Sequence, residues 1–139
     1  MSDSIIDPSL VQAYRQTRFK ADNGLILPIG QPNAALVQAQ RQQGTDCSAF
    51  ITACNPFSQP LAADQNAARQ ADLAKALAQR GLAFVQGIGQ HPSNTWPGEA
   101  SYLVLGLALE DAKALGEQFC QNAIVWSAAD GVPQLILLR

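Results

Sequence analysis

Apolar residues recur at every second position in some segments of this chain and at every third or fourth position in others. The first spacing is typical of strands and the second of helices, so the sequence predicts strands that alternate with helices. Residues 17–21 and 25–29 place apolar or small side chains at every second position on either side of Asn23-Gly24, a dipeptide typical of a two-residue hairpin turn. Cys47 to Ala53 is short, mostly apolar and partly β-branched, which indicates a buried central strand. These segments therefore predict a sheet whose middle strand is covered on both faces.

Apolar residues three or four positions apart predict helices between the strands. These helices are expected to run from Asp7-Pro8 to about Arg15, from Asn33 to Gln43, from Asp64 to Gly81, and from Leu109 to Cys120, with Asp7, Asn33 and Asp64 as the N-caps of the first three. Further strands are expected over 82–89, 102–107, 123–127 and 134–138. The order is αββαβαββαββ, with no repeat or linker to divide it. We therefore expect one α/β (α+β) domain over residues 1–139, with a mixed sheet of about six or seven strands flanked by about four helices.

The composition restricts the partners and the location. Of the 139 residues, 47% are hydrophobic and 14% are charged, a low charge content that is compatible with a homodimer. The formal net charge of −2 provides no basic surface, so no nucleic-acid partner is expected. The N-terminus lacks the pattern of a signal peptide, and no apolar run approaches the about eighteen residues of a membrane span. We therefore expect a cytoplasmic protein with no membrane partner.

Metal and cofactor chemistry lack the necessary residues. The chain has three cysteines and one histidine, with no C-x-x-C spacing, which predicts neither a disulfide framework nor a metal site. Gly87-x-Gly89 lacks the third glycine of a dinucleotide loop, and no phosphate-binding loop is present. Cys54 and His91 are residue types of a cysteine protease, but no local motif accompanies them and a buried, inert Cys54 is the better interpretation. No cofactor is expected.

The first candidate loop, residues 52–66, follows the central strand and leads into the long helix. A strand, a loop and a helix start in that order often bind ligands, because the first turn of the helix offers free N–H groups. Thr52, Asn55, Ser58 and Asn66 would supply uncharged donors and acceptors there, and Asn66 stands at the head of the buried stripe that it shares with Gln70. The alternative is that Asn55-Pro56 is an ordinary turn and that Asn66 caps its own helix.

The second candidate loop, residues 89–101, leads into an apolar strand. Glu99 and Ser101 have the same parity and should point to one face of that strand. A carboxylate at the mouth of an apolar strand can have a raised pKa and act as a general acid or base, whereas a solvated Glu99 would have neither property. Trp96 could stack on a ligand ring or cover the core.

Several segments resemble a known family. They are Tyr14-x-x-Thr17, Ile51-Thr52-Ala53-Cys54-Asn55-Pro56, Asn66, the tract from Trp96 to Val104, and Ala112 through Phe119-Cys120-Gln121-Asn122-Ala123. Together they are similar to the bacterial domain-of-unknown-function family number 3293, from about Tyr14 to the C-terminal strands. The resemblance implies no activity. It does imply one polar cluster made of Thr52, Asn55, Asn66, Trp96, Glu99, Ser101 and Gln121. Ala100 stands where the family often has a second acidic residue, which argues against a mechanism with two carboxylates.

These observations favour a protein that binds a polar small molecule, nucleotide- or sugar-like, between the two loops. Glu99 would be the acid or base of a metal-free hydrolase or transferase, if the protein is an enzyme at all. The proposed ligand-binding residues are Thr52, Asn55, Asn66, Trp96, Ser101 and Gln121, with Tyr14 and Thr17 closing the site. The alternative is a non-catalytic interaction or regulatory module whose polar cluster is structural. A concave pocket and a raised pKa of Glu99 would favour the first hypothesis, and a flat, internally bonded surface the second.

Overall fold

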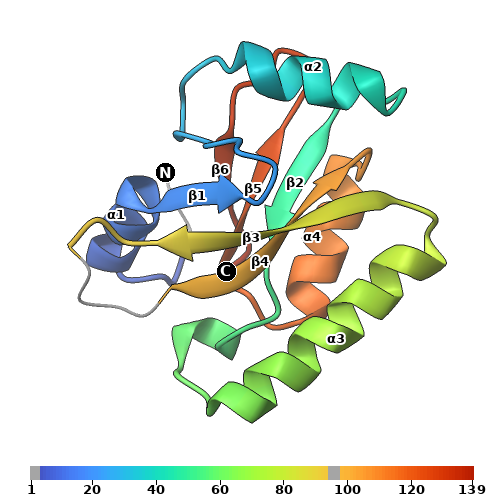
Figure 1. Ribbon diagram of the computed structural model, residues 1–139. Coiled ribbons are helices and arrows are strands. Elements are labelled where there is room, and N and C mark those ends of the chain that lie inside the picture. The colour runs from blue at the N-terminus through green and yellow to red at the C-terminus, as the bar shows by residue number, and fades with distance from the viewer. Residues whose placement is uncertain (1–3, 94–97) are drawn as a thin grey trace.

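The computed structural model describes residues 4–93 and 98–139, which fold around one sheet of six strands (Figure 1). The helices are α1 (Pro8–Gln16), α2 (Ala34–Gln42), α3 (Ala63–Gln79) and α4 (Leu109–Gln118), with a short 3-10 turn η1 (Pro56–Ser58). The strands are β1 (Arg18–Ala21), β2 (Ser48–Ile51), β3 (Ala83–Gln90), β4 (Glu99–Leu105), β5 (Ala123–Ser127) and β6 (Gln134–Leu137). The expected α/β architecture of one sheet flanked by helices is confirmed.

The strand order is β1-β3-β4-β2-β5-β6, and each of its pairings is antiparallel rather than mixed. Helices connect β2 to β3 and β4 to β5, a sequence order typical of parallel neighbours. In both cases, however, another strand lies between the two that the helix connects: β4 separates β3 from β2, and β2 separates β4 from β5. The strands joined by these helices are thus parallel in direction but not adjacent, which corrects the expectation of a mixed sheet.

The predicted N-terminal hairpin forms its turn but not its second strand. Ala21 N donates to Leu25 O at 2.8 Å around the predicted turn. The return segment then pairs only through an isolated bridge between Lys20 and Ile26. Beyond Pro28 the chain leaves β1, and Gly30 N donates instead to Pro133 O, at 2.7 Å. The expected order αββαβαββαββ therefore contains one strand too many, because residues 25–30 cross from one sheet edge to the β5–β6 turn.

Three helices begin as the sequence predicts, and α3 begins differently. The side chains of Asp7 and Asn33 accept from the first backbone N–H groups of α1 and α2, and α4 begins at Leu109. Asp64 lies within the first turn of α3, and Ala62 occupies the N-cap position. Gln65 Oε1 accepts from Ala62 N at 3.2 Å, so a side chain within the helix bonds to the backbone N–H of the N-cap residue. Asp64 is thus not the N-cap that the sequence suggested.

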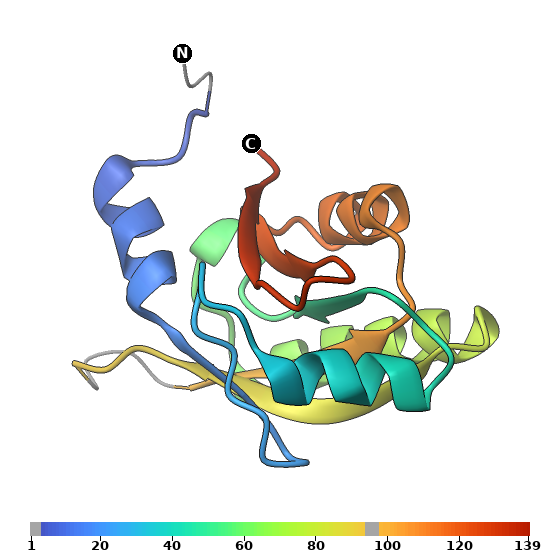
Figure 2. The same cartoon turned by 90° about the horizontal axis from the view of Figure 1, so that it is seen from above.

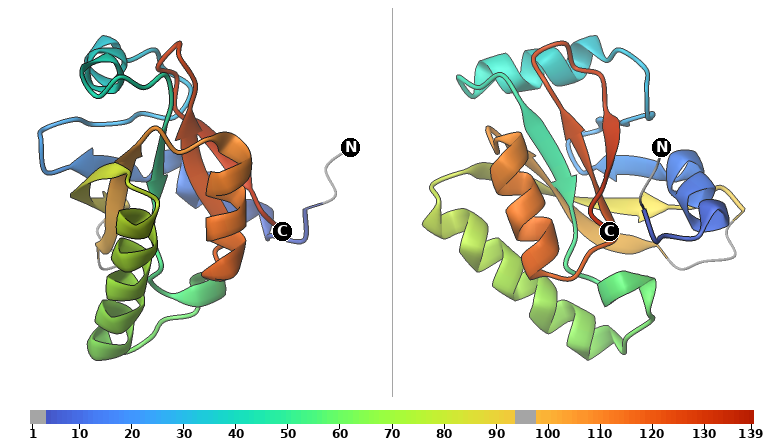
Figure 3. Two further views of the ribbon diagram at one scale, coloured as in Figure 1. Left: turned by 90° about the vertical axis from the view of Figure 1, so that its right-hand side faces the viewer. Right: turned by 180° about the vertical axis from the view of Figure 1, so that it is seen from behind.

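Alternating residues of the central strand β2 build two cores on opposite faces of the sheet. Ala49 and Ile51 belong to the core beneath α3 and α4, which lie side by side in Figures 1 and 3 and are bridged by Arg80 and Asp111 at 4.0 Å. Phe50 faces the other way and packs in a second core with Leu36 of α2. Burial on both faces explains why the expected strand from Cys47 to Ala53 lacks exposed polar positions.

The sheet curls strongly about this second core (Figure 2). The two edge strands approach opposite sides of one hollow, since Phe19 of β1 and Leu135 of β6 line the same cavity. The α1 helix lies at one end of the curled sheet, at the left in Figures 1 and 2.

Of the helices in residues 4–93 and 98–139, none is long and apolar enough to cross a membrane.

Candidate functional site

The concave face of the sheet contains a cavity of about 740 Å³. All six strands contribute to its wall, through Phe19, Gly89, Ser101, Phe50, Val125 and Leu135. Residues of α1, of the loop after β2 and of the first turns of α3 complete it. A hollow with mostly apolar walls and a few polar groups is the usual form of a small-molecule site.

The two candidate loops meet at this cavity. Each candidate residue within the described ranges lines it: Tyr14, Thr17, Thr52, Asn55, Asn66, Glu99, Ser101 and Gln121. Trp96 lies outside the described residues. The strand register explains part of this arrangement, because Ser101 and Glu99 share the parity of Leu103, which belongs to the core of the concave side.

Asn55 and Glu99 form the contact between the two loops. Asn55 Nδ2 donates to Glu99 Oε2 at 2.9 Å. Asn55 has a left-handed backbone, with φ of 49° and ψ of 68°, a conformation that asparagine tolerates better than most residues. Among residues 4–93 and 98–139, no donor contacts the other carboxylate oxygen of Glu99, Oε1. One oxygen of Glu99 is therefore held by the protein and the other is available.

Asn66 fixes Asn55 through a reciprocal pair of hydrogen bonds. Asn55 N donates to Asn66 Oδ1 at 2.9 Å, and Asn66 Nδ2 donates to Asn55 Oδ1 at 2.8 Å. The same Oδ1 also accepts from Leu61 N at 3.0 Å. Asn66 therefore contacts Asn55 rather than capping α3, and its role is to position Asn55.

Three further side chains bind the backbone where the chain leaves β2. Gln70 Oε1 accepts from Ala53 N at 2.7 Å, and Arg69 Nε donates to Ala53 O at 2.6 Å. Gln121 Nε2 donates to Cys54 O at 3.0 Å. Buried backbone groups that have left a sheet need such partners. We call Asn66, Arg69, Gln70 and Gln121 the loop brace. The sequence placed Gln70 on the buried face of α3, but the role of Arg69 was missed.

The hydroxyl groups of Thr52 and Ser101 bond to the backbone of β4. Thr52 Oγ1 donates to Ala100 O at 2.6 Å and accepts from Cys54 N at 3.0 Å. Ser101 Oγ donates to Glu99 O at 3.0 Å. Both residues line the cavity, yet their hydroxyl protons are already engaged. They connect β4 to the loop after β2.

Two glycines of β3 lie beside Glu99 and Ser101 of β4 and admit aromatic rings next to the strand. Gly89 is the register partner of Glu99, and Gly87 is that of Ser101. A Cβ at Gly87 would lie 2.7 Å from Lys20 O and 2.9 Å from the Phe50 ring, so no side chain fits there. A Cβ at Gly89 would meet only ordinary contacts, at 3.6 Å from the Phe19 ring. The sequence excluded these glycines as a dinucleotide loop and missed this role; their spacing of two along a strand was the available signal.

A second polar cluster joins α1 to η1 at the edge of the cavity. Tyr14 Oη and Ser58 Oγ share a hydrogen bond of 2.5 Å, and Asn122 Nδ2 donates to Tyr14 Oη at 3.0 Å. Thr17 Oγ1 instead donates to Ala13 O at 2.8 Å, within the end of α1. Tyr14 therefore closes the cavity through a direct contact, as does Ser58, whereas Thr17 lines it with its hydroxyl engaged.

Burial controls the ionisation of the two acidic groups at the center of the site. Burial raises the pKa of Glu99 above the ordinary glutamate value of 4.5, and the hydrogen bond from Asn55 opposes the rise. Burial also raises the pKa of Cys54, helped by the charge of Glu99 and opposed by the Thr52 hydrogen bond and by Arg69. A thiol with a raised pKa is a poor nucleophile. Within the described ranges, no three His, Cys, Asp or Glu side chains gather closely enough to hold a metal ion.

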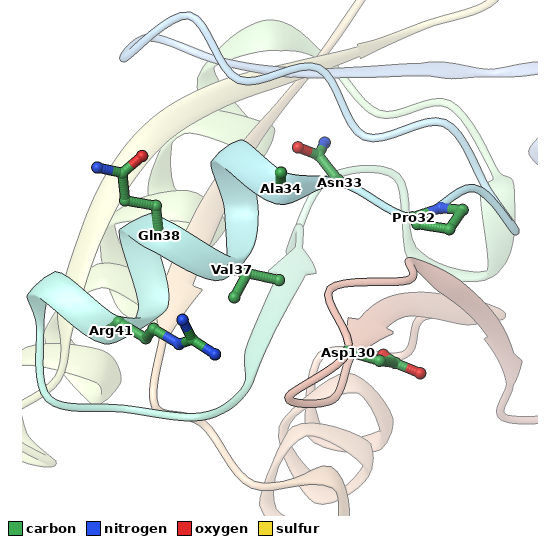
Figure 4. Close-up of a pocket in the computed structure, with 7 residues that line it drawn as sticks. All are labelled: Pro32, Asn33, Ala34, Val37, Gln38, Arg41 and Asp130. Carbon is green, nitrogen blue, oxygen red and sulfur yellow. The ribbon is translucent and has the colours of Figure 1, made fainter.

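A shallower hollow lies beside the start of α2, away from these residues (Figure 4). Figure 4 shows Gln38 and Arg41 on α2, and Asp130 on the turn before β6. Its lining residues are Pro32, Asn33, Ala34, Val37, Gln38, Arg41 and Asp130. None of the candidate residues from the sequence lines this hollow.

Residues 51–124 match the model of a family described as "Protein of unknown function (DUF3293)". The chain belongs to the DUF3293 family. The matched range begins in β2 and ends in β5, so it contains both candidate loops and the whole loop brace. The α1 helix, with Tyr14 and Thr17, lies outside it. The chain has no match among curated proteins and none among solved structures.

Replacing Gln70 of the loop brace should lower the stability of this DUF3293 protein more than replacing an exposed glutamine of the same helix. Gln70→Met keeps the volume and the helix propensity but leaves Ala53 N buried without an acceptor. The free energy of unfolding, measured by urea denaturation, is expected to fall by about 1–3 kcal/mol. Gln79→Met, at an exposed position of the same helix, is the control and should change it by less than about 0.5 kcal/mol. Equal stability of the two variants would contradict the role of Gln70.

The raised pKa of Glu99 predicts a stability that depends on pH. Because the pKa is higher in the folded protein than in the unfolded chain, wild-type stability should decline as the pH rises from 4.5 through the folded pKa. Glu99→Gln keeps an acceptor for Asn55 but cannot ionise, so it should be more stable than the wild type at neutral pH. Urea unfolding at several pH values measures the difference. If the difference in unfolding free energy between Glu99→Gln and the wild type stays constant from about pH 4 to about pH 8, the pKa of Glu99 is not raised by folding.

Proposed function

We propose that this protein binds a small molecule in the cavity of its curled sheet. The observation that carries the proposal is the open oxygen of Glu99, a partly buried carboxylate beside a cavity of about 740 Å³. Glu99 lines the cavity with a shifted pKa, and partly buried titratable groups of this kind are common at functional sites. Glu99 and Asn55 form the polar end of the site.

The rest of the cavity suits a ring. Phe19 and Phe50 pack edge to face, with ring centroids 5.4 Å apart, and both line the cavity. Val125 and Leu135 continue the apolar wall on the strands opposite. A nucleoside- or sugar-like molecule presents an apolar ring face together with polar substituents, which is the combination that these walls and Glu99 accommodate.

Glu99 is also the group we propose for proton transfer. A glutamate whose pKa is raised by burial accepts and returns a proton closer to neutral pH than an exposed one does. Metal-free hydrolysis or group transfer, with Glu99 activating water or a substrate hydroxyl and Asn55 holding its carboxylate, is the reaction type that this pair supports. Asn66 and Gln70 would hold the loop in place, and both also line the cavity.

The alternative is a non-catalytic interaction or regulatory module. The internal hydrogen bonds of Asn55 and Asn66 favour it, since such bonds also fix loops that have no ligand. A purely structural cluster would not need the open oxygen of Glu99 or the room in front of Gly89. We therefore favour the small-molecule site.

A thermal-shift screen against nucleosides and sugars tests this proposal. A compound that binds in the cavity should raise the wild-type melting temperature, corresponding to about 2.7 kcal/mol at a hundred times its Kd. Gly89→Leu should abolish the increase, because the Cβ fits at Gly89 and the longer side chain extends into the cavity. Ala83→Leu, at an exposed position of the same strand, is the control and should retain it. The proposal fails if no compound stabilises the wild type, or if Gly89→Leu responds equally well.

A further inference from the structure

We infer that the cavity selects a ligand whose polar end is a cation with several N–H donors, such as an amidinium or a protonated nitrogen heterocycle, carried on a flat apolar ring. This inference rests on the proposed function and specifies its ligand class. It follows from three properties of the cavity: its charges, its free hydrogen-bonding atoms and the aromatic wall beside Glu99.

The charges that line the cavity are acidic rather than basic. Among the described lining residues there is no lysine or arginine, and Glu99 is the only carboxylate. Arg69 lies near Cys54 but outside the lining, and its guanidinium donates to Ala53 O at 2.6 Å and to Phe119 O at 2.5 Å. A phosphate or carboxylate placed beside Glu99 would thus meet a like charge, and His91 is the only basic residue among the described lining residues.

The free hydrogen-bonding atoms at the Glu99 end are acceptors. The side-chain amides of Asn55, Asn66 and Gln121 all donate to partners within the protein. By contrast, neither Glu99 Oε1 nor Gln121 Oε1 receives a hydrogen bond from any residue in the described ranges. The second N–H of Asn55 Nδ2 is the exception, with no partner among the described residues; acceptors still outnumber it and favour a ligand that donates. Charge-assisted N–H bonds to a carboxylate are the strongest of this kind.

The wall beside Glu99 is aromatic, because two glycines of β3 leave room for the rings of Phe50 and Phe19. Gly87 and Gly89 pair with Ser101 and Glu99 across the β3–β4 ladder, and Gly87 cannot accept a Cβ. The Phe50 ring lies directly beside Gly87. A flat ring can pack against the Phe19 and Phe50 rings that line the cavity, with its donor groups directed at Glu99, whereas a branched aliphatic amine would pack against them less completely.

The competing choice is an anion at the start of α3. The N-terminal turn of a helix carries partial positive charge, and Ala63 and Ala67 of α3 also line the cavity. That turn, however, is exposed and contains Asp64, whose charge offsets the effect of the helix dipole. We therefore place the recognised charge at Glu99.

Three probes with the same ring separate these possibilities: benzamidine, benzamide and benzoate, which are cationic, neutral and anionic. Their binding is followed by NMR titration of the backbone amide signals of Gly89, Glu99 and Ser101. Benzamidine should bind about tenfold or more tightly than benzamide, since it adds a charge-assisted pair, and benzoate should bind more weakly than both. In Glu99→Gln the ratio between benzamidine and benzamide should fall to about one, and Gly89→Leu should weaken all three.

Each contrary result has its own meaning. Tighter binding of benzoate, with the largest shifts at Ala63 and Asn66, would overturn the inference in favour of an anion at α3 and leave the proposed function intact. A preference for benzamidine that persists in Glu99→Gln would overturn the role of Glu99. If none of the three probes shifts the cavity signals, the inference is wrong, and the proposed function then stands or falls with the nucleoside and sugar screen.

Discussion

The reciprocal hydrogen bonds between Asn66 and Asn55 are the contact on which the rest of the site depends. The chain leaves the central strand at Ile51 and must satisfy its buried backbone groups without a neighbouring strand. Asn66, Arg69 and Gln70 provide those partners from α3, and Gln121 provides one from the loop before β5. The result is an Asn55 held in a left-handed conformation, with its amide fixed against Glu99. The loop brace thus fixes Asn55 relative to Glu99, in addition to the direct bond from Thr52 Oγ1 to Ala100 O between the two loops.

At Glu99, the burial that suits ligand binding also lowers the stability of the protein when the carboxylate is ionised. The second core behind Phe50 and Leu36 holds the curled sheet, and the brace holds the loop, so the protein can tolerate an incompletely bonded carboxylate at Glu99. Burial makes ionised Glu99 costly, and a ligand with N–H donors would recover that cost by binding its free oxygen. Gly87 and Gly89 of β3 have no side chain of their own, and the rings of Phe50 and Phe19 lie against them instead.

The periodic parts of the sequence predicted the fold well, and long-range pairing was where prediction failed. Strand parity correctly placed Ser101 and Glu99 on one face, and the α3 stripe correctly placed Asn66 and Gln70 toward the loop. The antiparallel order could not be read from the sequence, because inserting β4 between β2 and β3 depends on packing between distant segments. The same limit hid Arg69, whose partner carbonyls at Ala53 and Phe119 are ordinary backbone atoms with no sequence signature. The sequence allows Asn66 to contact a ligand or to cap its helix, and in the structure its side chain bonds to Asn55.

The most direct test is an NMR titration of the Glu99 side-chain carboxyl in the wild type and in Asn66→Ala. The wild-type pKa should lie above 4.5, because burial outweighs the hydrogen bond from Asn55. Asn66→Ala removes the two bonds that Asn66 makes to Asn55 and leaves only the bond from Leu61 N, so the Asn55 bond that lowers the pKa of Glu99 should weaken and the pKa should rise further. A wild-type pKa at the ordinary value, or a pKa that Asn66→Ala leaves unchanged, would contradict a braced Asn55 and a desolvated Glu99.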